Sequence, residues 1–442
     1  MTKEELKAKV CEAIDLHRAE IIGLGESIFA DPELGYKEHN AAAKVKAIFD
    51  QLGIAYRDQV AVTGVVAPLK GKESKLRIAV MGELDAVVAP GHPHANPQTG
   101  AAHSCGHNAQ AAAMVGVAFG LHTSGAMEHL SGDVVLMAVP AEEYVEIEYR
   151  NGLREQGIIT FLGGKQEFVK LGVMDDIDVM IMHHLGTYIP GEAEPRTKAQ
   201  VAGGSNGFIG KLIRYIGKEA HSGGAPHMGI NALNAANIGL MAIHAQRETF
   251  QDQDHIRVHP IMTKGGDLVN VVPADVRLET YVRGASLDAI LDASKKVNRA
   301  LKAGADAVGA EVKITELPGY LPRLNVDAMT ELMYNNLCAL VGEEVVVKTA
   351  GSSGGSTDAG DISYLMPTLH PYIISVEGMA HSENYTIVDQ EMAYINSAKA
   401  MAMTIIDLLF DGAATALAIK EDFKPTLTKQ EYLDMWDAFV KQ

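Results

Sequence analysis

Two residues of types that bind transition metals stand two positions apart in this chain. Cys105 and His107 flank Gly106 in a polar turn, so a thiolate and an imidazole can converge on one or two divalent ions. A small buried cysteine beside a hydrogen-bonded histidine is the alternative explanation. The pair therefore indicates a metal site only if further acids and histidines follow comparable elements elsewhere in the chain.

Acids and histidines do follow the apolar runs that are typical of buried parallel strands. The runs at 76–81, 132–139, 177–182 and 372–376 are followed, in turn, by Glu83 and Asp85, Glu142 and Glu143, His183 and His184, and His381. Ligands bind beyond the carboxyl ends of strands in open α/β sheets, so we expect these side chains to share one edge. Taken alone, each acidic pair is explained at least as well by a solvated loop. The repetition of acids and histidines after successive strands favours a functional site at this edge.

The chemistry of these side chains is that of a two-metal hydrolase. The candidate metal ligands are Cys105, His107, Glu143, His184 and His381. Five ligands exceed the three that one catalytic zinc takes besides water, and they suit two ions about 3.5–4 Å apart. Adjacent carboxylates at a strand end point in different directions. Glu143 can therefore bind metal, while Glu142 accepts a proton from the attacking water and passes it to a leaving amine. A thiolate ligand favours zinc, with manganese, cobalt and nickel left open.

Length and charge limit the other possibilities. A chain of 442 residues is long enough for two domains. Its net charge of −18 argues against binding to nucleic acid or an anionic membrane. The first residues are charged and no 18 apolar residues run together, so we predict a cytoplasmic protein without a membrane partner. Three widely spaced cysteines offer no disulfide framework.

The order of predicted elements changes near residue 200. Before it, we expect helices at 3–29, 38–52 and 108–121 among the buried strands, and a closing helix at 389–410. Between 200 and 318 the pattern is strand, helix, two strands, helix and strand, the split βαβ arrangement of a ferredoxin-like domain. We therefore predict an α/β protein with a mixed, mainly parallel sheet. Its catalytic domain spans 1–199 and 319–442, with an inserted α+β domain at 200–318.

Seven short motifs resemble those of the dinuclear metallo-amidohydrolases, which include aminoacylases, glutamate carboxypeptidases and auxin-conjugate hydrolases. The motifs are Asp31-Pro32-Glu33-Leu34-Gly35, Gly82-Glu83-Leu84-Asp85-Ala86, Cys105-Gly106-His107-Asn108, Pro140-Ala141-Glu142-Glu143, Ala220-His221-Ser222, Asn270-Val271-Val272-Pro273 and Ser356-Thr357-Asp358-Ala359-Gly360-Asp361. The branch with the B subunit of p-aminobenzoyl-glutamate hydrolase and dipeptidase-like aminoacylases is the most similar. The resemblance implies a zinc-peptidase-like catalytic domain and an inserted lid and dimerisation domain.

The resemblance also assigns roles to single residues. The five candidate ligands match the family's metal ligands, and Glu142 matches its general base. His221 matches a lid histidine that reaches across a dimer to polarise the scissile carbonyl, which implies a homodimer. Asn270 matches a lid residue near the substrate, and Asp358 is a further candidate for substrate binding. Arg283 is our guess for the group that grips a substrate carboxylate, with a surface ion pair as the alternative.

The substrate stays open at this stage. We predict hydrolysis of an N-acyl amino acid, an aminobenzoyl-glutamate-like conjugate or a dipeptide that carries a free carboxylate. A deacetylase or desuccinylase of a biosynthetic intermediate and a catalytically retired binding protein are the alternatives. The segments 144–173 and 87–100 are longer than is usual in the family, and both flank the predicted site. The resemblance favours His184 over His183 as a ligand, because an apolar residue follows the family's histidine and Leu185 follows His184 here.

Overall fold

The computed structural model describes residues 1–440, and its central element is a mixed six-stranded sheet. The strands lie in the order β1 (Arg57–Val60), β2 (Gly64–Leu69), β6 (Asp133–Val139), β3 (Arg77–Glu83), β7 (Val179–Ile181) and β16 (Thr368–Leu369). The last four are mutually parallel, while β1 and β2 are antiparallel to their neighbours. The predicted α/β fold with a mixed, mainly parallel sheet is confirmed.

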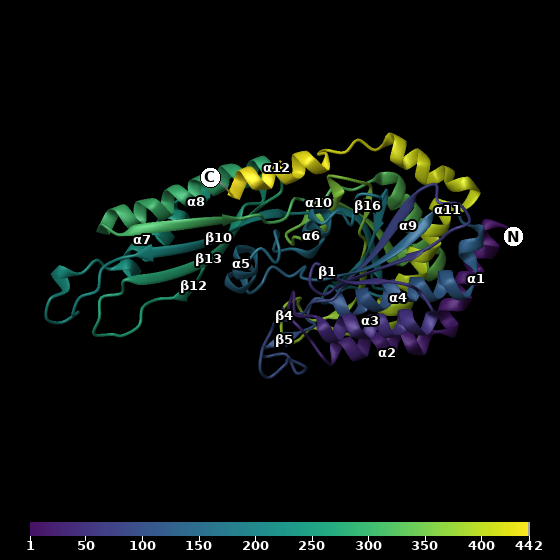
Figure 1. Ribbon diagram of the computed structural model, residues 1–442, viewed down its shortest axis with the longest axis horizontal. Helices are drawn as coiled ribbons and strands as arrows, with labels where there is room; N and C mark the ends of the chain where they lie inside the picture. Colours follow the sequence, from purple (N-terminus) through teal and green to yellow (C-terminus); the bar gives the residue numbers. More distant parts are fainter. Residues whose placement is uncertain (441–442) are drawn as a thin grey trace.

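Helices from both ends of the chain cover this sheet. They are α1 (Lys3–Leu16), α2 (Arg18–Phe29), α3 (His39–Leu52), α4 (His107–Thr123), α9 (Asp327–Val341) and α11 (Ser397–Asp422). The single helix predicted at 3–29 is in fact two helices, because the backbone leaves helical geometry at His17. α4 is buried from His107 to Leu121, as its run of small residues allows. Figure 1 shows α1, α2, α3 and α4 together beside the sheet, with α11 nearby.

One helical segment is long and apolar enough to span a membrane by length and composition. This segment, Glu391–Asp422, contains α11, and 61% of its most apolar window is buried inside the protein. The backbone departs from helical angles between Phe410 and Ala413, close to the predicted end of the closing helix at 410. Burial against α1, α4 and α9 is the behaviour of a core helix in a globular domain.

A second sheet brings distant parts of the catalytic region together. It contains β15 (Val346–Ser353), β9 (Ala199–Ser205), β17 (Tyr372–Glu377), β18 (Thr386–Ile387) and β8 (His184–Thr187). In the parallel pairing of β17 with β8, Tyr372 lies opposite His184. A short ribbon of β4 (Val87–Val88) and β5 (Ala101–Ala102) closes the expanded loop at 87–100. These pairings bring His184 and the segment before His381 to the same side of the molecule.

The third sheet forms a separate lobe that extends away from the other two (Figure 1). Its elements follow the order β10 (Gly207–Ile216), α7 (Ala232–Ala245), β11 (Arg257–Val258), β12 (Ile261–Lys264), β13 (Asp275–Gly284), α8 (Leu287–Val308) and β14 (Glu311–Leu317). The spatial order β11-β13-β10-β14, with β12 also on β13, is antiparallel. β9 pairs with β15 outside this lobe, so the lobe's sheet begins at Gly207. The domain limits at 200 and 318 stay predictions.

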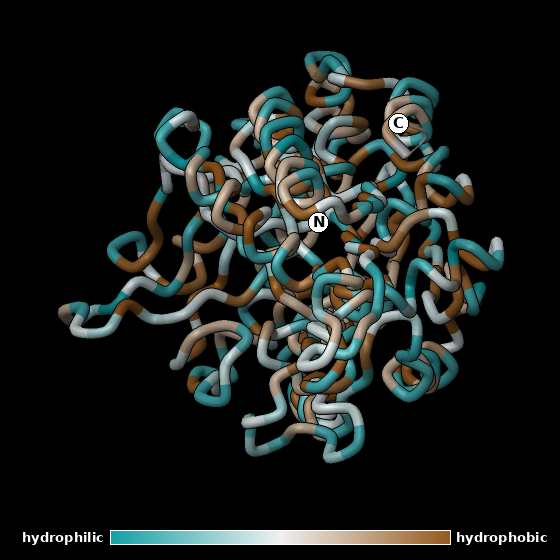
Figure 2. The backbone as a smooth tube through the Cα atoms, turned by 90° about the vertical axis from the view of Figure 1, so that its left-hand side faces the viewer, coloured by the Kyte–Doolittle hydropathy of each residue, from teal (hydrophilic) through white to brown (hydrophobic). Residues whose placement is uncertain are grey.

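Three further helices connect the lobe to the catalytic region: α5 (Ile147–Glu155), α6 (Gly164–Lys170) and α12 (Lys429–Val440). α12 carries Tyr432 and Trp436 into an apolar cluster that also contains Ile209 and Ile290 of the lobe. The hydroxyl of Tyr432 donates a hydrogen bond at 2.8 Å to Oδ1 of Asp361, which belongs to the short helix α10 (Ala359–Ser363). Figure 2, seen from the lobe's end, shows apolar segments inside and polar loops outside. The C-terminal tail is therefore part of the junction between the two regions.

Candidate metal centre

The metal-binding turn lies between a short strand and a helix. Gly106 has φ of 86°, and a Cβ there would meet the Tyr385 hydroxyl at 2.6 Å, so both backbone angle and space require glycine. His107 begins α4 and its Nδ1 lies 2.8 Å from the Asp85 carbonyl oxygen and 3.2 Å from Asp85 Oδ1. These acceptors take the Nδ1 proton, which leaves Nε2 of a neutral ring as the ligand atom.

Two groups of candidate ligands share Cys105. One group is Cys105, His107 and His184, the other is Cys105, Glu143 and His381, and within each the ligand atoms lie within 4.8 Å of one another. Cys105 Sγ is 3.3 Å from His184 Nε2, and His381 Nε2 is 2.9 Å from Glu143 Oε1. The structure therefore brings all five predicted ligands together, divided evenly around one thiolate. His183 is buried and belongs to neither group.

The chemistry of these atoms fits a pair of divalent ions. His107 Nε2 and Glu143 Oε1 are buried, and each faces a group of the opposite kind: His107 Nε2 lies 3.1 Å from Glu83 Oε2, and Glu143 Oε1 lies 2.9 Å from His381 Nε2. Imidazole and carboxylate atoms that face each other at such distances can bind a divalent cation between them once the imidazoles are neutral. Sulfur, imidazole and carboxylate donors together suit borderline ions such as zinc.

The two adjacent glutamates have opposite electrostatic surroundings. Burial raises the pKa of Glu142 well above its usual value, and the charges of Glu83 and Glu143 raise it further. Burial also disfavours the charge on Glu143, but the neighbouring His381 outweighs this effect and brings the pKa of Glu143 to about 2. A carboxyl group that holds its proton more readily is suited to general acid and base work. The predicted division of roles between Glu142 and Glu143 agrees with this difference and stays a prediction.

The cluster opens into a cleft of about 570 Å³ that lies between the catalytic region and the lobe. Phe208, Tyr281 and Arg283 line it from the lobe. Arg283 Nη1 donates to Ser356 Oγ at 2.9 Å, and its guanidinium carbon lies 5.4 and 5.2 Å from the ring centroids of Phe208 and Tyr281. Arg283 forms no ion pair with any described residue, so it is a free cation facing the cleft.

The two predicted lid residues lie elsewhere. His221 and Asn270 are both exposed, and neither lines the cleft of its own chain. They are neighbours, since the Ser222 amide donates to the Asn270 carbonyl at 3.0 Å and His221 pairs with Val271. The His221 ring accepts hydrogen bonds from the amides of Gly223 and Gly224. Their catalytic and substrate-binding roles stay predictions.

Asp358 occupies a different position from the one that a substrate-binding residue needs. It is fully buried, does not line the cleft, and its two oxygens accept hydrogen bonds from the backbone and side-chain nitrogens of Lys165. Lys165 Nζ also donates to Glu83 Oε1. Sequence reasoning missed Lys165, because nothing in the sequence around the start of α6 shows that this lysine contacts Glu83 and Asp358.

His370 is a second residue that the sequence reasoning missed. It lines the cleft, and its ring centroid lies 6.0 Å from that of His184 with 23° between the planes. It is buried, and neither of its ring nitrogens has a hydrogen-bond partner in the described chain. The signal was available: His370 directly follows strand β16, as the candidate ligand histidines follow theirs.

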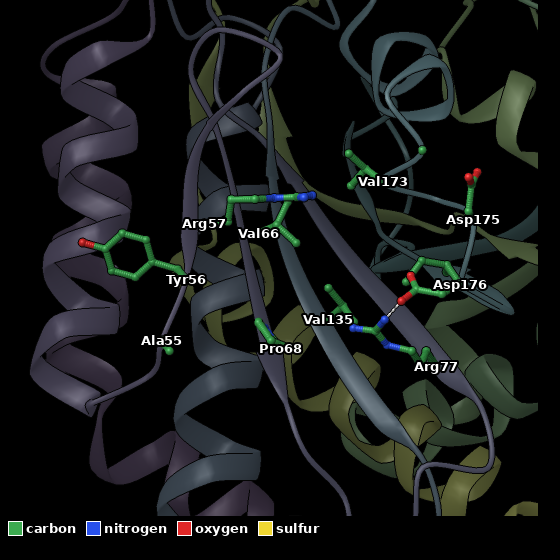
Figure 3. Close-up of a pocket in the computed structure, with 12 residues that line it drawn as sticks. Ala55, Tyr56, Arg57, Val66, Pro68, Arg77, Val135, Val173, Asp175 and Asp176 are labelled. Atoms are coloured by element: carbon green, nitrogen blue, oxygen red, sulfur yellow. Dashed lines mark ion pairs between the residues drawn. The ribbon is translucent and has the colours of Figure 1, made fainter.

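A second cleft of about 580 Å³ lies at the opposite, amino-terminal end of the parallel strands (Figure 3). Its floor is apolar, with Val66, Pro68 and Val135, and its rim holds an ion pair between Arg77 and Asp176. It is as large as the first cleft, but it contains none of the candidate ligands. Chemistry rather than size therefore identifies the functional cleft.

Comparison with known proteins agrees with this geometry. Residues 79–407 match the model of peptidase family M20/M25/M40. Xaa-Arg dipeptidase from Homo sapiens is 29% identical over 98% of this chain and 95% of its own, and N-acyl-L-amino acid amidohydrolase from Geobacillus stearothermophilus is 25% identical over 74% of this chain and 82% of its own.

Solved structures show the same fold. Aminobenzoyl-glutamate utilization protein from Klebsiella pneumoniae superposes with a TM-score of 0.67 at 19% identity, covering 90% of this chain and 98% of that one. The Bacillus subtilis YXEP protein, a dinuclear metal-binding peptidase, has a TM-score of 0.63 at 19% identity over 89% and 99% of the two chains. The fold and site define a metal-dependent hydrolase of peptide or amide bonds. The chain belongs to peptidase family M20/M25/M40.

Proposed function

We propose that this protein uses two divalent ions to hydrolyse the amide bond of an N-acyl amino acid, an aminobenzoyl-glutamate-like conjugate or a dipeptide whose leaving amino acid has a free carboxylate. The observation that carries the proposal is the division of five ligands into two groups around Cys105, with Glu142 beside them at the cleft. A binding protein that had lost catalysis would have no reason to keep both the full ligand set and the proton-accepting glutamate.

The residues divide the chemistry among themselves. Ions held by the two ligand groups supply Lewis-acid polarisation of the scissile carbonyl and activation of the attacking water. Glu142 takes the proton from that water and transfers it to the nitrogen of the leaving amine. Arg283, which donates a hydrogen bond to Ser356, binds the free carboxylate and so fixes the position of the substrate in the cleft. We place zinc first among the candidate ions on account of the thiolate.

A homodimer would complete the site. His221 and Asn270 are exposed in the single chain and lie beside exposed apolar side chains, Leu268 and Val269. β12 pairs with β13 alone among the described strands, and its Ile261 is also exposed. An apolar surface next to an open strand edge favours association of two copies. In such a dimer His221 of one subunit would reach the scissile carbonyl in the other.

The names of the relatives define the substrates to try first. They act, by name, on Xaa-Arg dipeptides, N-acyl-L-amino acids and N-acetyl-L-cysteine. Dipeptides and acyl amino acids both place an amide near a carboxylate, which suits a cleft lined by both Glu142 and Arg283. A deacetylase of a biosynthetic intermediate is the alternative. We expect a cytoplasmic location from the charge pattern.

The test is hydrolysis by metal-loaded and chelator-stripped protein across a panel of dipeptides, acetyl and succinyl amino acids and p-aminobenzoyl-glutamate. Metal content is measured on the same samples. Metal-dependent cleavage of any member supports the proposal, and the preferred member separates dipeptidase from deacetylase. If two ions bind and no member is cleaved, the binding-protein alternative gains support.

A further inference from the structure

The general base proposed above lies in a turn whose backbone conformation has to be held in place. Glu142 comes just after strand β6, and Ala141 before it has a φ of 55°, in the left-handed region that residues other than glycine rarely adopt. Such a conformation costs about 1–3 kcal/mol and persists only where the surrounding structure maintains it. The direction of the Glu142 side chain therefore depends on the contacts that hold this turn.

Side chains from two other segments hold the peptide group between Glu142 and Glu143. The Glu143 amide donates a hydrogen bond to Asp85 Oδ2 at 2.8 Å, and the Glu142 carbonyl accepts one from the Tyr320 hydroxyl at 2.5 Å. Tyr320 is buried, and a Cβ at Gly163 would lie 2.7 Å from its ring, so glycine at 163 makes room for this ring. Because the peptide group is planar, bonds to its oxygen and its nitrogen fix the directions in which the two glutamate side chains leave the backbone.

Tyr320 belongs to the segment that returns the chain from the lobe to the catalytic region. The segment follows β14, which ends at Leu317, and the Tyr320 carbonyl accepts a hydrogen bond from the Phe208 amide of β10 at 2.8 Å. A second tyrosine makes the reverse connection, since the Tyr144 hydroxyl donates to the Pro318 carbonyl at 2.7 Å. The turn that carries the base and the segment that leaves the lobe are thus joined in both directions.

The catalytic region also holds this returning segment on both sides of Tyr320. Asp361 Oδ2 accepts a hydrogen bond from the Leu321 amide at 3.2 Å, and Gln166 Nε2 donates one to the Gly319 carbonyl at 2.7 Å. Asp361 and Gln166 are both fully buried. The residues before and after Tyr320 are therefore anchored, which gives its hydroxyl a defined position.

We propose that Tyr320 is a positioning residue, which orients Glu142 by binding the backbone carbonyl of that residue. The inference rests on the proposed function, in which Glu142 is the general base. Tyr320 lines the cleft, but its hydroxyl is engaged by the Glu142 carbonyl, so its loss should lower kcat and leave KM unchanged. A displacement of about 1 Å can cost about 100-fold in rate, and we expect about 10-fold when one of the two bonds to the peptide group is lost.

The experiment compares Tyr320→Phe with Tyr215→Phe, which loses a hydrogen bond of the same kind elsewhere. The Tyr215 hydroxyl donates to the Leu301 carbonyl at 2.9 Å inside the lobe, and Tyr215 is also fully buried. Thermal unfolding, metal content, kcat and KM are measured for both variants. We expect similar losses of thermal stability and full metal content in both, with kcat reduced about 10-fold in Tyr320→Phe alone.

A second comparison tests whether Tyr320 acts through the base. In a Glu142→Ala background, Tyr320→Phe should have no further effect on kcat, because no carboxylate is left to orient. Such non-additivity is the mark of two residues that act together. An equal fall in kcat in both backgrounds would mean that Tyr320 acts independently of Glu142, and the inference would be wrong.

The outcomes separate this inference from the proposed function. If the metal-loaded parent cleaves no amide, both are wrong. If the parent is active and Tyr320→Phe has the same kcat as Tyr215→Phe, the hydroxyl only stabilises the fold and the proposed function stands. If KM rises while kcat is kept, Tyr320 contacts the substrate, and the positioning role is wrong while the proposed function again stands.

Discussion

The metal cluster and the lid pair differ in how complete each one is within a single chain. The cluster joins residues from four separate strand ends, which are buried or half-buried apart from the exposed His381, and its ligand atoms lie against one another in two groups. His221 and Asn270 are exposed, lie in one loop region of the lobe, and have local hydrogen bonds. We predict that the first set is completed by ions and the second by a surface from outside the chain.

This difference indicates what holds the side chains of each set in position. Buried ligands are held by sheet register and by partners such as Asp85, so their positions are fixed before any ion binds. We predict that the exposed lid residues gain their position in the site from a second subunit. Metal binding should therefore be a property of the single chain, whereas turnover should depend on the dimer. The predictions below test this division, beginning with the largest effect.

Removal of the shared ligand should have the largest effect. We expect Cys105→Ala to lose bound metal and all measurable hydrolysis, because both ligand groups depend on the same sulfur. Metal analysis and an amide-hydrolysis assay on the same sample measure this. Cys338→Ala, a half-buried cysteine on α9, is the matched control and should keep both properties. A Cys105→Ala protein with two bound ions would contradict the bridging role.

Adjacent glutamates should give different results. Glu142→Ala should retain metal and lose about 10²–10⁴-fold in turnover, the usual contribution of a general base. Glu143→Ala should lose metal together with activity, since its Oε1 belongs to a ligand group. Measurement of turnover and metal content in both variants distinguishes the base from the metal ligand. Equal activity in Glu142→Ala and the parent would exclude the assigned mechanism.

The lid histidine tests whether the site crosses between subunits. His221→Ala should keep its metal and slow turnover by about 10²–10³-fold, as loss of an oxyanion donor does. Mixing it with Glu142→Ala under conditions of subunit exchange should restore about a quarter of parent activity. Half of randomly formed twofold dimers are hybrids, and each hybrid has one complete site. No recovery in exchanged mixtures would place His221 outside the partner's site.

The smallest effect should come from Arg283, the residue proposed to bind the substrate carboxylate. Arg283→Met should weaken substrate binding by about 1.5–3 kcal/mol, the contribution of a hydrogen bond to a charged group. The effect should appear mainly in KM. A substrate analogue with an amide in place of the free carboxylate provides the control, because it should distinguish parent and variant poorly. If the loss is the same for both substrates, Arg283 does not contact the carboxylate.

Much of the fold followed from local pattern. Continuous apolar runs marked β3, β6 and β7 because strands covered on both faces carry no polar alternation, and the βαββαβ order marked the lobe. The break at His17 was beyond such reasoning, since hydrophobic periodicity continues across it, whereas the predicted end of the closing helix at 410 lies at the observed departure from helical angles. The sequence of α12 gives no sign of its position, because Tyr432 and Trp436 pack in a cluster with Ile209 and Ile290, which are far away in sequence.

The candidate ligands could be named from the sequence because parallel strands place their carboxyl ends at one edge, so each strand end carries information about the site. The packing of distant segments determined the remaining features of the site. The pairing of β17 with β8 put His184 rather than His183 into a ligand group. The fold of residues 163–170 placed Lys165 between Glu83 and Asp358. Such charge contacts join residues about 80 to 190 positions apart, and no local propensity encodes them.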